Sequence, residues 1–531
     1  MTGLLIISQN DMYEKYNVLI ITPAPTETSP QFTDELFKKY SEFDNFNICH
    51  LKSSKDIKNI ELENNNIIVI SKQLLQNYIN DETIKEIKNL KLNIIIFDEN
   101  HFGGTSDLSE DIISSYESKN TVKLFLTATY NKSLRKWKIP LECQIFWDIE
   151  DEQFCKTQNI EGLIEKHGDM VNDVLDEFKK EGFTNKEVLQ EYEKYPNLHI
   201  LTTMFDSQRW DIIKDDIMDS KYGFSMETLF ALSKGKKKEL LYLPQIKKVL
   251  EFISGCNKEK NFKNGDLSFF GRINKLVSDT NSRQPFTQLW FLPVIGINDI
   301  SENLKKIMAE DDILKNYDVY IVNSKSNELV DNIKGEINKR EIKAKENKKN
   351  GLIILAGNML TLGITLSLCD IVFLLNDTLS SDKVMQMMYR SMTESKDKDK
   401  KCGFVIDMKI SRVLQACISY NIHKKIQNTE DKIKFLIEHH LINIDSDYLI
   451  NKKLNSDKII NKLLDIWKSD PINNLSILLK QIEDDVVEMD NLDQKALNNY
   501  FTKSINGNKF DVNIELKDED DDTQSVKNGK E

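Results

Sequence analysis

Cysteine, proline and glycine are scarce in this chain, at 7, 9 and 19 of 531 residues. No C-x-x-C pair occurs among the cysteines, which argues against a structural zinc site and a disulfide framework and favours a reducing compartment. The low glycine and proline content argues against a collagen-like or fibrous chain. No apolar run reaches the ~18 residues of a membrane span, and residues 1–7 lack the basic start and cleavage site of a signal peptide. We therefore expect an intracellular protein without a membrane segment.

Charge and length set the class of protein. Acidic residues outnumber basic ones by 85 to 72, giving a net charge of -13 and a pI of about 5.3. This balance argues against a protein whose surface is basic over most of its area and binds nucleic acid generally. It is compatible with a local basic groove. A chain of 531 residues with 40% hydrophobic side chains has enough apolar sequence for several cores. We expect three or more domains in a soluble globular protein.

The hydrophobic pattern predicts an α/β fold with two parallel-sheet domains. Short β-branched runs alternate with polar helical stretches in the first part of the chain, at 17–22, 66–70, 92–97 and 122–127. The same rhythm returns in a second part, at 288–293, 317–322, 351–356, 371–375 and 403–407. We place the first domain at 1–150, a helical insertion at 151–283, the second domain at 284–425, a helical carboxyl-terminal region at 426–515 and a disordered acidic tail at 516–531.

Two adjacent carboxylates, Asp98 and Glu99, follow the predicted strand at 92–97. The carboxyl end of a parallel strand delivers side chains into the ligand crevice. Asp98 would hold Mg²⁺ through its water shell, and Glu99 would orient or deprotonate the water that attacks a γ-phosphate. An ordinary surface pair is the competing interpretation, because the chain has 85 acidic residues.

Further segments in a fixed order decide between these interpretations. In the first domain, Asp98-Glu99-Asn100-His101 is followed by Thr127-Ala128-Thr129 and preceded by two strand ends, at Thr22-Pro23 and at Ser71. This series resembles motifs Ia to III of superfamily 2 helicases of the DEAD/DEAH-like type. The resemblance implies that Thr22, Pro23 and Ser71 contact the nucleic-acid backbone, that Thr127 and Thr129 couple the two domains, and that His101 links motif II to motif VI. For His101, an ordinary surface histidine is the alternative.

The second domain continues the series. Residues 288–293 occupy the place of the motif IV strand, and residues 356–365 resemble motif V, in which Gly363 allows close backbone approach while Thr361 and Thr365 offer hydroxyls to phosphate. Gln386 and Arg390 lie in a segment that resembles motif VI, usually Q-x-x-G-R-x-x-R. There an arginine stabilises charge on the transferring phosphoryl group and senses domain closure. A methionine-rich helix that only packs into a core is the competing interpretation of this segment.

The resemblance implies two RecA-like domains that use ATP and Mg²⁺ to move on DNA or RNA. The layout is also similar to helicases of large DNA viruses, which implies viral transcription or replication proteins as partners and the cytoplasm or virion as location. Two alternatives stay open: a catalytically inactive helicase-like protein that binds nucleic acid or acts as a scaffold, and the motor part of a restriction-type or transcription-termination assembly.

Two departures from the motif pattern stand out. The phosphate-binding segment G-x-x-x-x-G-K-[ST] is absent from the 531 residues, and Met1 falls where it should end. We expect a split gene, a late start codon or a decayed copy, and a gap in the middle of the first sheet where the preceding strand would lie. Tyr389 and Thr393 replace the glycine and the second arginine of motif VI. Arg390 is the expected arginine finger, since Arg412 lies too far along the sequence.

Overall fold

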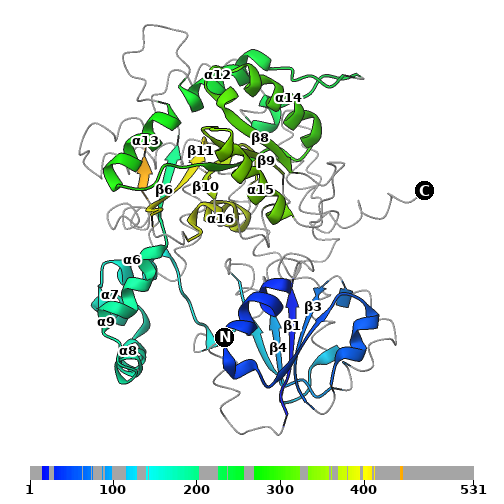
Figure 1. Cartoon of the computed structure of the whole chain (residues 1–531), viewed down its shortest axis with the longest axis vertical. Coiled ribbons are helices and arrows are strands. Elements are labelled where there is room, and N and C mark those ends of the chain that lie inside the picture. The colour runs from blue at the N-terminus through cyan, green and yellow to red at the C-terminus, as the bar shows by residue number, and fades with distance from the viewer. Residues whose placement is uncertain are drawn as a thin grey trace, which may run out of the picture.

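The computed structural model describes just over half of the chain and contains two parallel sheets (Figure 1). The described residues are 15–22, 29–61, 64–72, 74–75, 87, 90–98, 115–127, 139–140, 143–202, 225–235, 237–255, 268–322, 333–357, 360, 369–378, 381–394, 399–409, 412 and 443–445. The predicted acidic tail at 516–531 lies outside these residues, as does the predicted helical region at 426–515 apart from 443–445.

The first sheet has five parallel strands in the order β2-β3-β1-β4-β5. Their bounds are β1 Asn17–Thr22, β2 Phe46–Leu51, β3 Asn65–Ser71, β4 Ile94–Phe97 and β5 Val122–Phe125. Successive side chains of a strand point to opposite faces, so the continuous apolar run of β1 supplies two cores. Leu19 and Ile21 pack in one core, and Val18 and Ile20 pack in the other.

Short helical turns connect the strands of this sheet: η1 Gln31–Leu36, η2 Phe37–Lys39, η3 Ser41–Phe43 and η4 Ser54–Asn59. Ser53 caps η4 in a reciprocal arrangement with Asp56, whose carboxylate accepts from the Ser53 backbone N–H at 2.8 Å. Such caps satisfy N–H groups that the first helical turn leaves without intrahelical acceptors.

The expectation of a gap in the middle of the first sheet is wrong. Strand β1 pairs directly with β3 on one side and with β4 on the other, and β4 pairs with β5. Pairing among the described strands is therefore continuous, and the β5 edge ends the sheet. Val122 and Leu126, on and just after β5, are 42% and 44% exposed.

A group of helices follows the first sheet along the chain: α6 Ile149–Lys156, α7 Ile160–His167, α8 Met170–Lys180, α9 Asn185–Gln190 and the turn η7 Glu191–Lys194. We call residues 145–195 the helical module. Asp148, Asn159 and Thr184 cap α6, α7 and α9 by accepting hydrogen bonds from backbone N–H groups of the first turn. Cys155, Leu163 and Leu189 form its small buried core.

The second sheet has seven strands in the order β12-β6-β11-β10-β7-β9-β8, and all its pairings are parallel. The strands are β6 Asn197–Thr202, β7 Thr287–Phe291, β8 Tyr317–Val322, β9 Gly351–Ala356, β10 Cys369–Leu374, β11 Cys402–Asp407 and β12 Asn443–Asp445. Together with the first sheet, this arrangement confirms the predicted fold class of two parallel-sheet α/β domains.

Helices cover both faces of the second sheet (Figure 1). One face packs against α12 Leu243–Ser254, α13 Phe269–Thr280 and α14 Ile297–Glu310, and the other against α15 Ile333–Glu346 and α16 Ser381–Tyr389. The short elements α11 Met226–Leu229, η9 Leu314–Asn316 and η11 Arg390–Met392 complete this unit. Within the described ranges, no helix is both long and apolar enough to span a bilayer.

The segment predicted as a helical insertion, 151–283, is not helical throughout. It contains β6, which pairs with β11 inside the second sheet, and α12 and α13, which pack in that sheet's core. Strand β12, in the predicted helical carboxyl-terminal region, pairs with β6 in turn. The second unit therefore draws on residues well before position 284, and the predicted domain limits stay predictions.

Candidate nucleotide and nucleic-acid site

Three candidate residues lie at the carboxyl edge of the first sheet. Thr22 ends β1 and is in register with Ser71 at the end of β3. Asp98 follows β4 directly, and its backbone N–H donates to the carbonyl of Ile21 at 2.9 Å. Because parallel strands end at one edge, these three residues are neighbours although they are far apart in sequence. The structure thus brings together candidate residues from three of the predicted motifs.

The hydroxyl groups of Thr22 and Ser71 take part in local hydrogen bonds. Thr22 Oγ1 lies 2.8 Å from Ser29 Oγ, and Ser71 Oγ accepts from the backbone N–H of Leu74 at 3.2 Å. Both side chains are buried, at 1% and 2% exposure. These bonds stabilise the chain where it leaves the sheet edge. A nucleic-acid contact at either position stays a prediction.

Asp98 is the one described residue of the predicted motif II. Its side chain is half-buried in the turn after β4, whose residues Ile94–Phe97 are all buried. Thr127, two residues beyond β5, is also described and half-buried. Among the described side chains, no three His, Cys, Asp or Glu residues are grouped as a metal site requires. Binding of Mg²⁺ through Asp98 stays a prediction.

Several candidate residues lie outside the described part of the chain, and their predicted roles are untested. They are Pro23, Glu99, His101, Thr129, Thr361, Gly363 and Thr365.

In the second unit, the predicted motif VI segment forms α16 and the turn η11. Met385, Met387 and Met388 are fully buried against the sheet, so core packing accounts for the methionines. Gln386 is also buried, at 7% exposure, whereas Arg390 at the start of η11 is half-buried. The turn η11, which begins at Arg390, packs against β10 and β11.

Close packing positions η11 against the sheet. A Cβ atom at Gly403 of β11 would clash with the backbone oxygen of Ser391. Only glycine allows this approach. Ser391 Oγ in turn donates to the carbonyl of Met388 at 2.9 Å, which joins η11 to the end of α16. The segment that carries Arg390 is therefore fixed from both sides.

Lys400 holds the chain just after η11. Its Nζ donates to the carbonyls of Cys369 at 2.7 Å and Thr393 at 3.1 Å. The side chain is 1% exposed, and burial lowers the pKa of its ammonium group below the usual value. Nothing in the sequence singles out Lys400, because it lies in a run of lysines and aspartates. Lys400 was therefore not predicted from the sequence.

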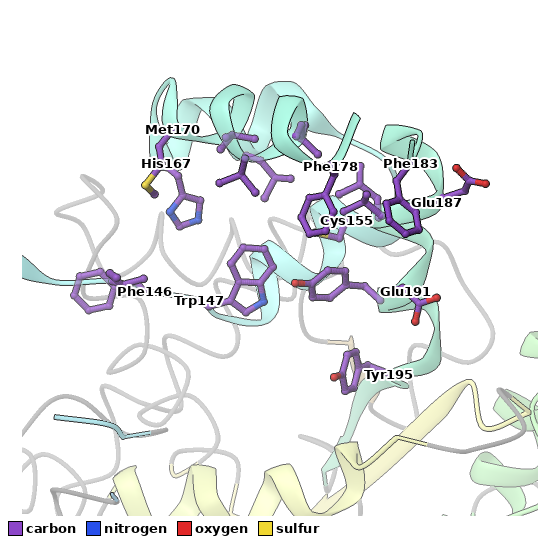
Figure 2. A pocket seen from close by; sticks show the side chains of 18 of the residues that line it. Phe146, Trp147, Cys155, His167, Met170, Phe178, Phe183, Glu187, Glu191 and Tyr195 are labelled. Atoms are coloured by element: carbon purple, nitrogen blue, oxygen red, sulfur yellow. The ribbon is translucent and has the colours of Figure 1, made fainter. Parts of the chain in front are cut away.

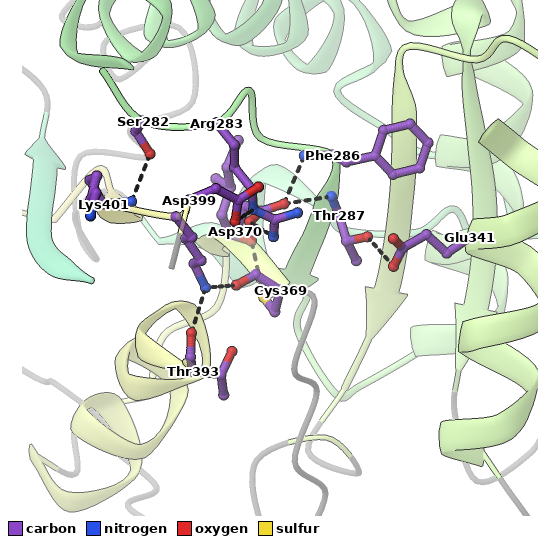
Figure 3. Close-up of polar contacts among 12 residues, drawn as sticks. Ser282, Arg283, Phe286, Thr287, Glu341, Cys369, Asp370, Thr393, Asp399 and Lys401 are labelled. Atoms are coloured by element: carbon purple, nitrogen blue, oxygen red, sulfur yellow. Dashed lines mark hydrogen bonds and ion pairs between the residues drawn. The ribbon is translucent and has the colours of Figure 1, made fainter. Parts of the chain in front are cut away.

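Asp370 organises the same edge of the second sheet (Figure 3). Its carboxylate accepts from Arg283 Nη2 at 2.6 Å and from the backbone N–H groups of Phe286 at 2.7 Å and Thr287 at 3.2 Å. A buried carboxylate needs such donors to offset the loss of hydration. The bonds fasten the start of β10 to the start of β7, next to the chain held by Lys400.

Comparison with solved structures gives weak global likeness. LlaBIII, an ATP-dependent Type ISP restriction-modification enzyme bound to DNA, is 13% identical, with 86% of this chain and 30% of that chain covered and a TM-score of 0.44. The helicase Lhr of Mycobacterium smegmatis, bound to ssDNA and AMP-PNP, is 9% identical, with 78% and 43% covered and a TM-score of 0.37. A fragment of a candidate HsdR subunit of a type I restriction enzyme from Vibrio vulnificus YJ016 is 12% identical, with 75% and 54% covered and a TM-score of 0.35.

This chain thus spans between 30% and 54% of the length of these three structures. No curated protein matches its sequence significantly. A family match is found in the first α/β unit, where residues 3–132 match the family described as "Type III restriction enzyme, res subunit". The matched range contains β1 to β5 and the edge that carries Thr22, Ser71 and Asp98. Residues 3–132 are therefore similar to the ResIII family, the res subunit of Type III restriction enzymes.

Proposed function

We propose that this chain is the motor portion of an ATP-dependent helicase or translocase that moves on DNA or RNA. One observation carries the proposal: the ResIII match at residues 3–132 coincides with a parallel sheet whose carboxyl edge presents Asp98 beside Thr22 and Ser71. That edge is where α/β proteins bind nucleotides.

In this proposal each candidate residue has one role. Asp98 holds Mg²⁺ through water, and Glu99 orients the water that attacks the γ-phosphate. Arg390, helped by Gln386, stabilises charge on the phosphoryl group when the two units close. Lys400 and Gly403 act as positioning residues, because they fix the backbone on either side of η11.

Turnover of ATP in this proposal needs a phosphate-binding segment, because backbone N–H groups and a lysine must neutralise the β- and γ-phosphates. The 531 residues contain no G-x-x-x-x-G-K-[ST] segment. ATP and Mg²⁺ are therefore cofactors only when that segment is supplied. The viral affiliation, with transcription or replication proteins as partners, belongs to the same proposal.

A restriction-type assembly is a second candidate setting for the motor, favoured by the family that residues 3–132 match. The alternative from another class is an inactive helicase-like protein that binds nucleic acid or serves as a scaffold. It agrees with the absent phosphate-binding sequence. The two classes differ in ATP turnover.

The first test adds a phosphate-binding segment to the full chain and measures ATP turnover. With that segment restored to the full chain, ATP turnover should rise on addition of DNA or RNA. Glu99→Gln should abolish turnover while leaving nucleotide binding largely intact. Glu117→Gln, at an exposed position of the same unit, is the matched control and should turn over ATP normally.

The outcomes separate the candidates. Nucleic-acid binding without ATP turnover in the restored chain would favour the scaffold. Turnover that is unchanged in Glu99→Gln would remove Glu99 from its assigned role, and turnover without any response to nucleic acid would contradict a translocating motor.

A further inference from the structure

The helical module contains an apolar groove that the proposed motor chemistry does not use. The cavity has a volume of about 830 Å³ and lies between α8 on one side and residues 145–147 with η7 on the other. Figure 2 shows Trp147, Phe178 and Phe183 turned toward it, with Glu187 and Glu191 at one end. Most of the lining is aliphatic or aromatic.

Helix α8 has an apolar stripe that lines this groove. Met170, Val174 and Phe178 are four residues apart and are 56%, 49% and 41% exposed. Leu175, in contrast, is a buried residue of the same helix. Residues at i, i+4 and i+8 form one ridge of a helix, which is the surface that packs into the groove of a second helix. Among the described residues, no other helix covers the ridge formed by Met170, Val174 and Phe178.

The opposite wall of the groove is preformed. The Trp147 ring stacks on His167 with ring centres 6.0 Å apart and contacts Tyr192 at 5.4 Å. His167 Nε2 lies 2.7 Å from a carboxylate oxygen of the fully buried Asp151, which also accepts from Lys166 Nζ at 2.8 Å. This ion-pair network fixes the wall from behind, so binding here requires little ordering of side chains.

Charge restricts what can occupy the groove. Residues 148–195 contain fourteen Asp and Glu residues but only six Lys and no Arg, a net charge of -8 out of -13 for the whole chain. A phosphate backbone would be repelled by this module. A small-molecule site would need convergent polar groups inside the cavity, whereas the carboxylates here stand at the rim.

We propose that the groove binds an amphipathic α-helix of a partner protein, with an apolar ridge that packs on Met170, Val174 and Phe178 and with Lys or Arg residues that face Glu187 and Glu191. The apolar ridge would supply affinity, and the basic flanks would supply orientation and speed of association. Phe183, in edge contact with Phe178 at 6.3 Å, closes one end of the groove and sets where the helix stops.

The test uses the full chain and three model peptides of about five helical turns. One has leucines at i, i+3, i+4 and i+7 with lysines between them, the second has glutamate in place of every lysine, and the third is a scrambled form of the first. Calorimetry should detect micromolar binding of the Leu/Lys peptide only. Val174→Asp should weaken that binding by at least about tenfold.

Asn172→Asp is the matched control, because it adds the same charge at an exposed position of α8 that does not line the groove. It should bind the Leu/Lys peptide within about twofold of the unchanged chain. Helix content by circular dichroism should be equal in both variants. Absence of binding, equal binding of all three peptides, or equal losses in both variants would overturn the proposal. Self-association of the chain that Val174→Asp abolishes would also overturn it, by assigning the groove to a second copy.

Discussion

Arg412 and Asp407 form a bidentate ion pair at the carboxyl edge of the second sheet. Arg412 Nε and Nη2 donate to the two carboxylate oxygens of Asp407, each at 2.8 Å. The guanidinium also donates to the carbonyls of Asn376 at 2.6 Å and Leu374 at 3.1 Å. Both charged side chains are buried, at 3% and 0% exposure. One arginine thus joins the end of β10 to the end of β11.

Removing this arginine should destabilise the second unit strongly. Arg412→Met leaves the Asp407 carboxylate buried without its cation, which should lower the free energy of unfolding by about 3–5 kcal/mol. Arg412→Lys should restore only part of this loss, since an ammonium group cannot make the two-pronged contact. Urea denaturation followed by circular dichroism measures the change. Lys180→Met, at an exposed position of α8, is the control and should leave the midpoint unchanged. An unchanged midpoint in Arg412→Met would contradict the buried ion pair.

His199 should make stability depend on pH. It is buried on β6 beside the ring of Phe404, and burial lowers its pKa from 6.5 to about 4. The unfolded chain binds a proton near pH 6.5, but the folded chain does not until about pH 4, so stability is present above pH 6.5 and is lost as the pH falls toward 4. The loss should be about 3 kcal/mol.

Urea unfolding at several pH values between 7 and 4 measures this dependence. His199→Gln has no titrating ring at this position, so its free energy of unfolding should fall less steeply over the same range. Parallel curves for the two proteins would show that His199 does not titrate as its burial requires.

The cysteines should differ sharply in reactivity. Cys143 is exposed, whereas Cys49, Cys155 and Cys369 are buried, and burial raises the pKa of their thiols to about 11, 12 and 12. The thiolate is the reactive form, so at pH 8 an alkylating reagent should modify Cys143 before these three buried cysteines. Mass spectrometry of digested peptides after short labelling measures the order. Fast modification of Cys369 in the folded protein would contradict its burial in the second sheet.

Strand prediction succeeded where the sequence has uninterrupted β-branched runs. Residues 17–22 were predicted as a strand and form β1 with the same limits. Strand β2 was missed because Asn47 and His50 interrupt its apolar pattern, as is usual for a strand at the sheet edge. Strand β6 was missed because it follows a long charged helical stretch and includes His199. Its burial comes from tertiary pairing with β11, which no local pattern encodes.

The candidate site, like the strands, was predicted in part and missed in part. The meeting of Thr22, Ser71 and Asp98 followed from a general property of parallel sheets, so motif order was enough to predict it. The support around Arg390 was not predictable, because Lys400 and Asp370 act through contacts with backbone groups distant in sequence. Such contacts depend on which strand ends become neighbours, and the residue types alone do not reveal that.

The open edge of the first sheet bears on how this chain behaves when it is produced alone. Among the described strands, β5 ends the sheet, and Val122 and Leu126 stand exposed at or beside it. An edge strand with apolar side chains is a template for pairing with another strand. In the cell, a strand that pairs with β5 would cover these apolar side chains and help to keep the protein soluble. Without one, the same edge offers recombinant protein a route to oligomers and inclusion bodies.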